Sequence, residues 1–262
     1  MLELYHWEPN GSWLKPLIAL TEKRLQFRGH YVDVPSLEQY QRGFLQAIRE
    51  TAIPLEGEGP VLVHDGRQVT ESLFITEYLE DAFPEHPLRP VAPLLQARIL
   101  AWARFINEVL MPAVSTLGCR AYLVPLLKGR DRAQLAPLLA RIPVAYIREG
   151  WLSALENSYP ADLIEDSRRK IALAVRRLEE ALAGGEWLVG DAYSLADIDA
   201  FSICNSLPTL TPDLVSAGAS PQLWQWVERI RTRPAVRTAL GLSRTGRPEQ
   251  AFAPGPEHSR WG

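Results

Sequence analysis

Cysteine is scarce in this chain, which has Cys119 and Cys204 among its 262 residues. Two cysteines cannot build a disulfide framework, nor can they supply the four ligands of a structural zinc site. The five histidines show no metal-ligand spacing and the HExxH motif does not occur, so we expect no bound metal.

An excess of charge of one sign is also missing. Lys and Arg number 28 against 31 Asp and Glu, which gives a formal net charge of -3. Without a basic stripe, we expect no nucleic-acid or membrane partner. No apolar run approaches the roughly 20 residues of a membrane span, and the first residues lack the pattern of a signal peptide. The sequence therefore predicts a cytoplasmic protein.

Two motifs of common enzyme classes are absent as well. Gly57 and Gly59 do not form a dinucleotide-binding fingerprint, because the downstream glycine and helix are missing. The Gly-x-Ser-x-Gly elbow of the α/β-hydrolases does not occur either. The chain therefore does not carry the usual sequence signatures of nicotinamide-dependent enzymes or of serine esterases.

Strand and helix patterns alternate in the first part of the chain. They fall, in order, at residues 2–7 (strand), 13–20 (helix), 31–34 (strand), 37–48 (helix), 60–70 (hairpin) and 71–83 (helix). The order β-α-β-α-β-β-α is typical of a thioredoxin-like α/β domain, in which helices flank a small mixed sheet. We assign this domain to residues 1–84.

Prolines at positions 84, 87, 90 and 93 then stop the helix and indicate an interdomain linker. Beyond them helical spacing dominates, most clearly at 94–110, 164–183 and 224–230. We therefore predict an all-helical domain over residues 93–243. Its last part includes Ser194 and Asp197, spaced as a capping box at the start of a buried helix. The Pro-, Gly- and Arg-rich tail, 244–262, is expected to be loosely ordered.

The segment 59–72, GPVLVHDGRQVTES, carries the strongest local signal. A proline precedes an apolar strand, Asp65-Gly66 is a hairpin turn, and a second strand leads to Glu71 and Ser72. These two residues open a helix, where a carboxylate, a hydroxyl and free backbone N–H groups come together.

This order resembles the glutathione-binding half of the glutathione-transferase superfamily. In that family the residue before a cis-proline pairs its backbone with the cysteinyl part of glutathione, and a Glu-Ser pair holds the γ-glutamyl end. The resemblance implies these roles for Gly59, Pro60, Glu71 and Ser72. The usual Val-Pro is Gly59-Pro60 here, and the segment from 44 to 60 is longer than the family pattern.

The glycyl carboxylate of glutathione needs a further ligand, for which Gln39 and Arg42 are the candidates. The family resemblance also implies a homodimer. Further segments are similar to the bacterial lignin β-etherases and extend the resemblance over nearly the whole chain: 4–5, 14–17, 69–72, 77–85, 141–151, 211–215 and 231–236.

The first turn reads Asn10-Gly11-Ser12-Trp13 and contains no thiol. Disulfide exchange and cysteine-type lyase chemistry are therefore disfavoured. A helix N-terminus with a hydroxyl favours an anion, so Ser12 is the candidate hydrogen-bond donor to the glutathione thiolate, with Asn10 as runner-up. The alternative is that Ser12 only caps the helix, and Trp13 either shapes the mouth of the site or packs.

The resemblance to β-etherases implies an apolar pocket for an aromatic substrate. Aromatic side chains that could line it are Trp7, Trp102, Phe105, Tyr146 and Phe201, with Tyr122 and Trp151 as further possibilities. The alternative for each is an ordinary place in the core, because aromatic residues in helical stripes usually pack.

The resemblance as a whole implies glutathione-dependent cleavage of β-aryl ethers, by thiolate displacement of a phenolate from an aromatic α-ketone. One alternative is a general glutathione transferase that conjugates or isomerises small electrophiles. A second is a glutathione-fold binding protein without turnover, suggested by Gly59 and the long 44–60 segment.

Overall fold

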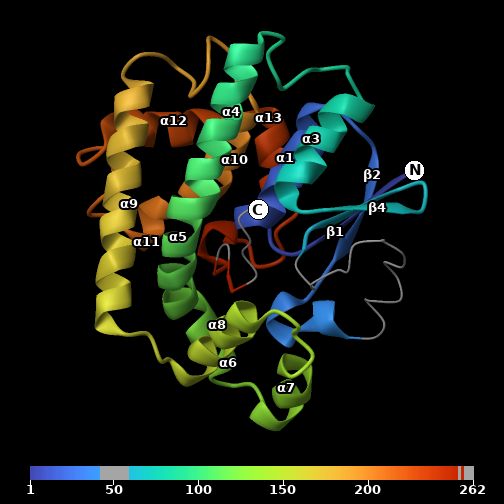
Figure 1. Ribbon diagram of the computed structural model, residues 1–262, viewed down its shortest axis with the longest axis vertical. Helices are drawn as coiled ribbons and strands as arrows, with labels where there is room; N and C mark the ends of the chain where they lie inside the picture. The colour runs from blue at the N-terminus through green and yellow to red at the C-terminus, as the bar shows by residue number, and fades with distance from the viewer. Residues whose placement is uncertain (42–58, 253–254, 257–262) are drawn as a thin grey trace.

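The computed structural model describes residues 1–41, 59–252 and 255–256 of the chain (Figure 1). A four-stranded sheet has the order β2-β1-β3-β4. Its strands are β1 (Leu2–His6), β2 (Phe27–Tyr31), β3 (Val61–His64) and β4 (Arg67–Thr70). β1 runs parallel to β2 and antiparallel to β3, which forms the predicted hairpin with β4. Helices α1 (Leu14–Glu22) and α3 (Ser72–Ala82) pack against each other beside this sheet.

Two predicted elements differ from the observed ones. The second strand covers 27–31 instead of 31–34, because Val32 and Val34 reach the core from a loop that turns into a 3₁₀ helix. Residues 37–41 form a 3₁₀ turn, Glu38–Tyr40, where an α-helix was expected. Leu37 has a left-handed backbone (φ 55°), which interrupts a helix. The rest of that expected helix, 42–48, lies outside the described residues.

A buried ion pair fixes the linker to the first domain. Lys23 at the end of α1 lies 2.7 Å from the Glu80 carboxylate of α3. Glu80 also accepts hydrogen bonds from the backbone N–H groups of Leu88 and Arg89, each at 3.1 Å. Because the carboxylate satisfies both the ammonium and the linker backbone, residues 88–89 are held against α3.

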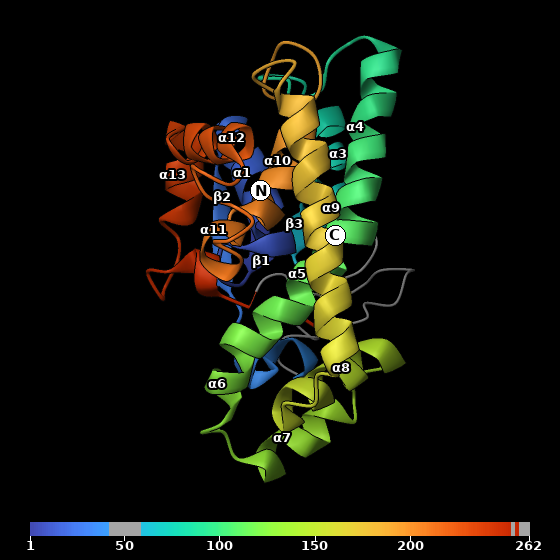
Figure 2. The same cartoon turned by 90° about the vertical axis from the view of Figure 1, so that its left-hand side faces the viewer.

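The chain after the linker is helical in its described residues. The helices are α4 (Pro93–Phe105), α5 (Met111–Gly118), α6 (Val124–Leu127), α7 (Arg132–Leu139), α8 (Ala145–Glu156), α9 (Ala161–Leu182), α10 (Leu195–Cys204), α11 (Leu207–Leu210), α12 (Pro221–Arg231) and α13 (Pro234–Leu240). Two π-helical turns, Ile106–Leu110 and Cys119–Leu123, join α4, α5 and α6 into one run. Helices α6, α7 and α8 extend from one end of the molecule, as both views show (Figure 2).

The run 93–127 is long and apolar enough to cross a membrane by length and composition, so the sequence prediction that no run approaches this length was too strict. More than half of its most apolar window, 56%, is buried inside the protein. The run packs on α9 and α10, as a core helix of a bundle does. Length and composition are therefore weak evidence for a membrane span here.

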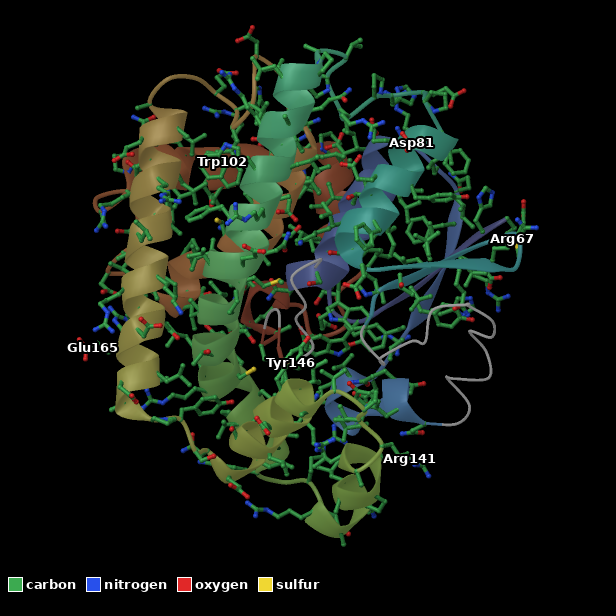
Figure 3. All side chains as sticks on the ribbon, in the orientation of Figure 1. Arg67, Asp81, Trp102, Arg141, Tyr146 and Glu165 are labelled. Atoms are coloured by element: carbon green, nitrogen blue, oxygen red, sulfur yellow. The ribbon has the colours of Figure 1, made fainter. Side chains whose placement is uncertain are left out.

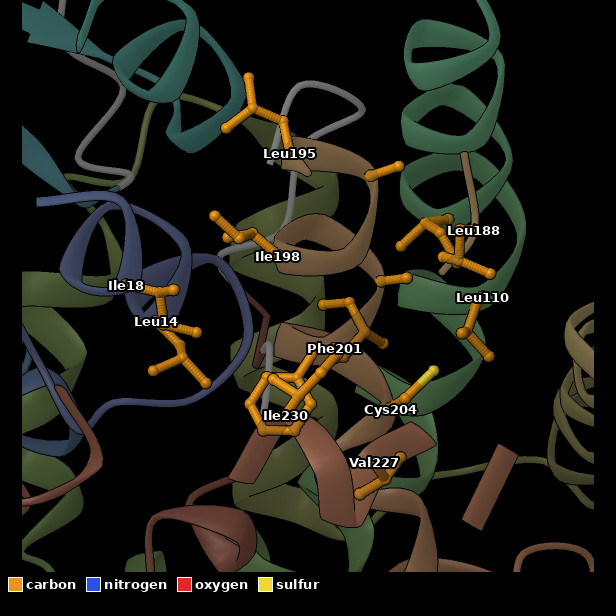
Figure 4. Packing of buried hydrophobic residues seen from close by; sticks show 14 of the residues in the cluster. Leu14, Ile18, Leu110, Leu188, Leu195, Ile198, Phe201, Cys204, Val227 and Ile230 are labelled. Atoms are coloured by element: carbon orange, nitrogen blue, oxygen red, sulfur yellow. The ribbon is translucent and has the colours of Figure 1, made fainter. Parts of the chain in front are cut away.

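Helix α10 joins the two parts of the fold. The predicted capping box is confirmed, with Ser194 and the Asp197 carboxylate bonding reciprocally. The same carboxylate accepts from the backbone N–H of Leu188 and from the indole N–H of Trp226. Burial raises the pKa of Asp197, and these donors oppose the rise. Figure 4 shows α10 between Leu14 and Ile18 of α1 on one side and Leu110 and Leu188 on the other, so the core is continuous across both domains.

Candidate functional site

The predicted first turn lies where the sheet, α5, α10 and the C-terminal segment meet. Asn10 is the N-cap of a 3₁₀ turn, Gly11–Trp13, that leads into α1. Ser12 is buried, and its hydroxyl donates to the thioether of Met111 on α5 at 3.6 Å. A thioether is a weak acceptor, so this contact holds the hydroxyl only loosely.

Asn10 is more firmly engaged than Ser12. Its Oδ1 accepts from the backbone N–H of Gly11 at 2.9 Å and from the Ser206 hydroxyl at 3.1 Å. Its Nδ2 donates to the carbonyl oxygen of Ala251 at 3.0 Å. Two of these partners, Ser206 and Ala251, are distant in the sequence, so Asn10 connects the turn to the helical domain and to the C-terminal segment.

The structure gives a steric reason for the glycine at position 59. The Gly59-Pro60 peptide bond is cis. A Cβ built on Gly59 would lie 1.9 Å from Cη2 of Trp13, whose side chain is 2% exposed. The indole therefore occupies the space that a valine side chain would need. Trp13 packs against the segment before β3, as one of the two sequence alternatives proposed.

The hairpin brings the two predicted glutathione-binding segments together. Val61 at the start of β3 pairs with Thr70 at the end of β4, so Pro60 and Glu71 lie next to each other. Glu71 has a positive φ of 65°, which is unusual for a residue with a Cβ. The hydroxyl of Ser72 is buried without a hydrogen-bond partner among the described residues.

An unsatisfied buried hydroxyl at the start of α3 fits a charged or polar ligand group, because the first N–H groups of a helix are also unpaired within it. Gln39 is buried in the 3₁₀ turn Glu38–Tyr40. Arg42, the other candidate for the glycyl carboxylate, lies outside the described residues.

The five aromatic residues predicted to line a pocket do not come together. Trp7 is buried in the same hydrophobic cluster as Trp13. Phe201 is a core residue of α10 and packs edge-on against Trp226, with ring centroids 6.3 Å apart. Tyr146 lies on α8 and is 51% exposed. The prediction for Phe201 is wrong because α10 buries its side chains on all sides.

Trp102 and Phe105 line a cavity that is separate from the turn with Ser12. It lies between α4 and α9, and Arg98, Arg177 and Glu180 also line it. The Arg177 guanidinium lies 4.6 Å above the centre of the Phe105 ring. Figure 3 shows Trp102 between these two helices, whereas Tyr146 lies on α8. The two residues therefore belong to an outer groove of the helical domain, not to the turn with Ser12.

Glu8 is a prominent residue of the turn that the sequence did not single out. Its buried carboxylate accepts hydrogen bonds from the Tyr31 hydroxyl at 2.8 Å, the Arg244 N–H at 2.8 Å, the Thr245 hydroxyl at 2.9 Å and the Ser243 hydroxyl. Burial alone would raise the pKa of Glu8, but these donors together lower it. The carboxylate is therefore charged at neutral pH and binds the segment after α13.

That segment differs from the expectation of a loosely ordered tail over 244–262 in the part that the structure describes, while residues 253–254 and 257–262 lie outside the described residues. Residues 244–252 and 255–256 have defined positions, and Ala251 and Phe252 are buried. Figure 1 shows the red segment after α13 near α5 and α11. Composition favoured disorder, but anchoring by Glu8 and Asn10 gives this polar, proline-rich stretch enough contacts to be ordered.

A buried ionic cluster one turn after Ser12 was also not predicted from the sequence. The Lys15 ammonium lies 2.6 Å from an Asp199 carboxylate oxygen on α10 and 2.7 Å from Oδ1 of Asn107. Asn107 lies in the first π-helical turn and donates to the carbonyl oxygen of Ala103 at 2.9 Å. The Lys15 side chain is 1% exposed and the Asp199 side chain 7%, so the pair is inside the protein. It links α1 to the helical domain.

Known proteins resemble the chain over most of its length. The model of the "Glutathione S-transferase, N-terminal domain" matches residues 14–87, and that of the "Glutathione S-transferase, C-terminal domain" matches residues 135–234. Protein LigF of Sphingobium sp. (strain NBRC 103272 / SYK-6) is 36% identical over 249 residues, which cover 93% of this chain and 94% of LigF.

Solved structures give the same result. The crystal structure of the β-etherase LigF from Sphingobium sp. strain SYK-6 superposes with a TM-score of 0.85 and 34% identity, covering 92% of this chain and 99% of that one. Glutathione transferase F7 from Populus trichocarpa superposes with a TM-score of 0.69 over 92% of this chain and 98% of that one. At 23% identity the poplar enzyme supports the fold alone.

Proposed function

Because this chain belongs to the glutathione S-transferase family, we propose that it uses glutathione to cleave β-aryl ether bonds in lignin-derived aromatic α-ketones. The observation that carries the proposal is the similarity to LigF, which is described as a β-etherase, over nearly the full length of both chains. The arrangement of the first turn around Ser12 supports the same chemistry.

Glutathione would lie along the edge formed by the turn and the hairpin. We assign its γ-glutamyl end to Glu71 and Ser72, and its cysteinyl backbone to Gly59 before Pro60. The buried, unsatisfied hydroxyl of Ser72 supports this assignment, because a carboxylate of the ligand would accept its hydrogen bond. Gln39 and Arg42 remain the proposed ligands of the glycyl carboxylate.

Ser12 is the proposed donor to the glutathione thiolate. Lowering a thiol pKa of about 8.5 by two units takes about 2.7 kcal/mol of preferential thiolate stabilisation. One hydrogen bond to a charged group contributes about 1.5–3 kcal/mol. The Ser12 hydroxyl is available for this role, since its acceptor is a thioether. Asn10 would have to share an amide that already bonds three partners.

The thiolate then attacks the carbon that bears the aryl ether, beside the ketone. A carbon–sulfur bond forms as the carbon–oxygen bond breaks, and the electron pair leaves with the aryl oxygen as a phenolate. A phenol has a pKa of about 10, so the phenolate leaves without an acid and takes a proton from water afterwards. The protein contributes an aligned thiolate and an apolar environment for the rings.

The proposal is tested by incubating the protein with glutathione and an α-keto β-aryl ether. Phenol and the glutathione thioether should form together, and only in the presence of glutathione. Formation of neither product, while a general electrophile is still conjugated, would assign the protein to the ordinary transferases. Glutathione binding without any turnover would favour a non-catalytic binding protein.

We expect Ser12→Ala to lower kcat/KM for the ether by about 10- to 100-fold, the loss of one hydrogen bond to a charged group. The absorbance of bound thiolate should then appear at higher pH than in the unmodified protein. Ser12→Thr, which keeps the hydroxyl, is the matched control. Asn10→Ala should reduce thermal stability more than it shifts the thiolate titration. A shift caused by Asn10→Ala and not by Ser12→Ala would reverse the assignment.

The family also leads us to propose a homodimer. The groove between α4 and α9 supports it, because Trp102 and Phe105 are partly exposed there between charged residues such as Arg98 and Glu180. We expect light scattering to give twice the 29.4 kDa mass of one chain, and Trp102→Glu to give the mass of one chain. A single-chain mass for the unmodified protein would contradict the proposal.

A further inference from the structure

The buried hydrophobic residues of the protein form two clusters, and the smaller one joins the two domains. We call residues 124–156, which include α6, α7 and α8, the helical extension. Its buried hydrophobic residues belong to the second cluster, whereas those of α3, α9 and α10 belong to the main core. Segment 32–40 of the first domain contributes four residues to the second cluster: Val32, Val34, Leu37 and Tyr40. This segment therefore packs in the cluster that the extension supplies.

A hydrogen bond also attaches segment 32–40 to the extension. Arg130, which follows α6, donates from Nη1 to the Ser36 hydroxyl oxygen at 2.9 Å. Ser36 donates in turn to the Asp33 carboxylate, and the Glu38 carboxylate accepts from the Asp33 N–H at 2.6 Å. Figures 1 and 2 both show the short blue helices of this segment beside the extension. One guanidinium of the extension thus holds a turn that is bonded within itself.

Leu37 depends on this support, because its backbone is left-handed (φ 55°). A residue with a Cβ keeps such a conformation only where the surrounding contacts impose it. The Leu37 side chain is 1% exposed and packs in the second cluster. Gln39, a proposed ligand of the glycyl carboxylate, follows two residues later in the 3₁₀ turn Glu38–Tyr40. The position of Gln39 therefore depends on the packing that the extension supplies.

The opposite end of the proposed glutathione site rests on other contacts. Ser72, at the γ-glutamyl end, begins α3, whose buried Ile75 and Leu79 belong to the main core. Val61, next to Pro60, packs in the second cluster, but its strand is paired on both sides, with β1 and with β4. A change in the extension should therefore move the glycyl end of the site more than the cysteinyl and γ-glutamyl ends.

From these contacts we propose that the helical extension positions the glycyl end of the glutathione site, with Arg130 and Leu127 as positioning residues for Gln39. Leu127 lies three residues before Arg130 and is 4% exposed in the second cluster. The inference rests on the glutathione site of the proposed function and adds to it a part of the helical domain that acts without touching the ligand. Recognition of the glycine residue of glutathione then depends on the second domain.

Two ligands that differ by the glycine residue test the proposal: glutathione and γ-glutamylcysteine. Calorimetry compares their Kd values in the unmodified protein, in Arg130→Met and in Leu127→Ala. Arg132→Met is the matched control for the first variant, because Arg132 also donates one hydrogen bond, to the Leu155 carbonyl oxygen within the extension. Leu182→Ala is the control for the second, since Leu182 is similarly buried (5% exposed) but belongs to the main core. Hydrogen exchange follows the backbone amides of 32–40 in each variant.

We expect Arg130→Met to raise the Kd of glutathione by about threefold, as for one exposed hydrogen bond, and Leu127→Ala to raise it by about tenfold. The Kd of γ-glutamylcysteine should not change, and amide exchange in 32–40 should become faster. Neither control should show these effects. If Leu127→Ala does not fold, Arg130→Met decides alone, because Arg130 is exposed and its loss leaves the cluster intact.

An unchanged glutathione Kd, equal losses for both ligands, or equal affinities of the unmodified protein for the two ligands would overturn the proposal. The expected differences between the ligands, without phenol release from the ether, would overturn the etherase function alone.

Discussion

Replacing Lys15 with methionine is expected to lower the free energy of unfolding by about 3–5 kcal/mol, because the change leaves a buried carboxylate without its counter-charge. Asp199 lies 2.6 Å from the ammonium and is almost fully buried. The two long contacts from Asn107 to the same carboxylate, at 3.4 and 3.5 Å, cannot replace an ammonium. Urea denaturation followed by circular dichroism measures the loss.

The double variant Lys15→Met/Asp199→Leu separates the ion pair from the packing. It should be destabilised by less than the sum of the two single variants, since no isolated charge is left inside. Arg104→Met is the matched control, because its pair with Glu108 is exposed (79% and 35%) and should contribute less than about 1 kcal/mol. Additive losses in the double variant would show that the two side chains do not interact. Because Lys15 lies in the first turn of α1, we also expect the Lys15 variant to lose turnover.

Local signals predicted the parts of the fold that local geometry determines. The turn Asp65-Gly66 produced the β3–β4 hairpin, since Gly66 adopts the positive φ that such a turn requires. Ser194 and Asp197 form the capping box that their three-residue spacing predicted. In each case the residues that form the contact are close in the sequence. The patterns before β3 were less specific, and the second strand was misplaced by a few residues.

The candidate site depends on contacts that no local pattern contains. Glu8 and Ser243 are 235 residues apart, and Asn10 and Ala251 are 241 apart. The composition of the segment after α13 predicted a loosely ordered tail. Composition cannot show which distant acceptors bind this segment. The prediction that Trp102 and Phe105 line a pocket at the first turn was wrong for a related reason. Helical spacing shows that Trp102 and Phe105 share a face of α4, but it does not show that this face meets α9 instead of the first turn.

Gly59→Val, which restores the residue type usual in the family, is expected to destabilise this protein by about 3 kcal/mol. Inserting side-chain atoms into a packed core typically costs about 1–3 kcal/mol, and the space needed here is already filled by an aromatic ring. A Cβ alone would meet three ring carbons of Trp13, at 1.9, 2.2 and 2.9 Å. The indole is buried among its neighbours, so it cannot move into solvent to make room. Chemical denaturation compares the variant with the unmodified protein.

Trp13→Leu should rescue part of this loss. Alone it leaves a cavity in the core, and substitutions of this kind cost several kcal/mol, up to about 5 for a complete truncation to alanine. In the double variant the valine fills part of the space that the indole leaves, so its loss should be smaller than the sum of the two single losses. Gly129→Val is the matched control, because a Cβ there meets no atom within 4 Å and the change should stay within about 0.5 kcal/mol.

Additive losses would contradict this steric coupling of Trp13 and Gly59. The coupling also bears on glutathione. Gly59 is the proposed partner of the cysteinyl backbone, so a double variant that regains stability should regain glutathione binding as well if the indole serves only to pack. If stability returns while glutathione affinity does not, the indole of Trp13 contacts the bound peptide. The second sequence alternative, a tryptophan that shapes the mouth of the site, would then hold together with the first.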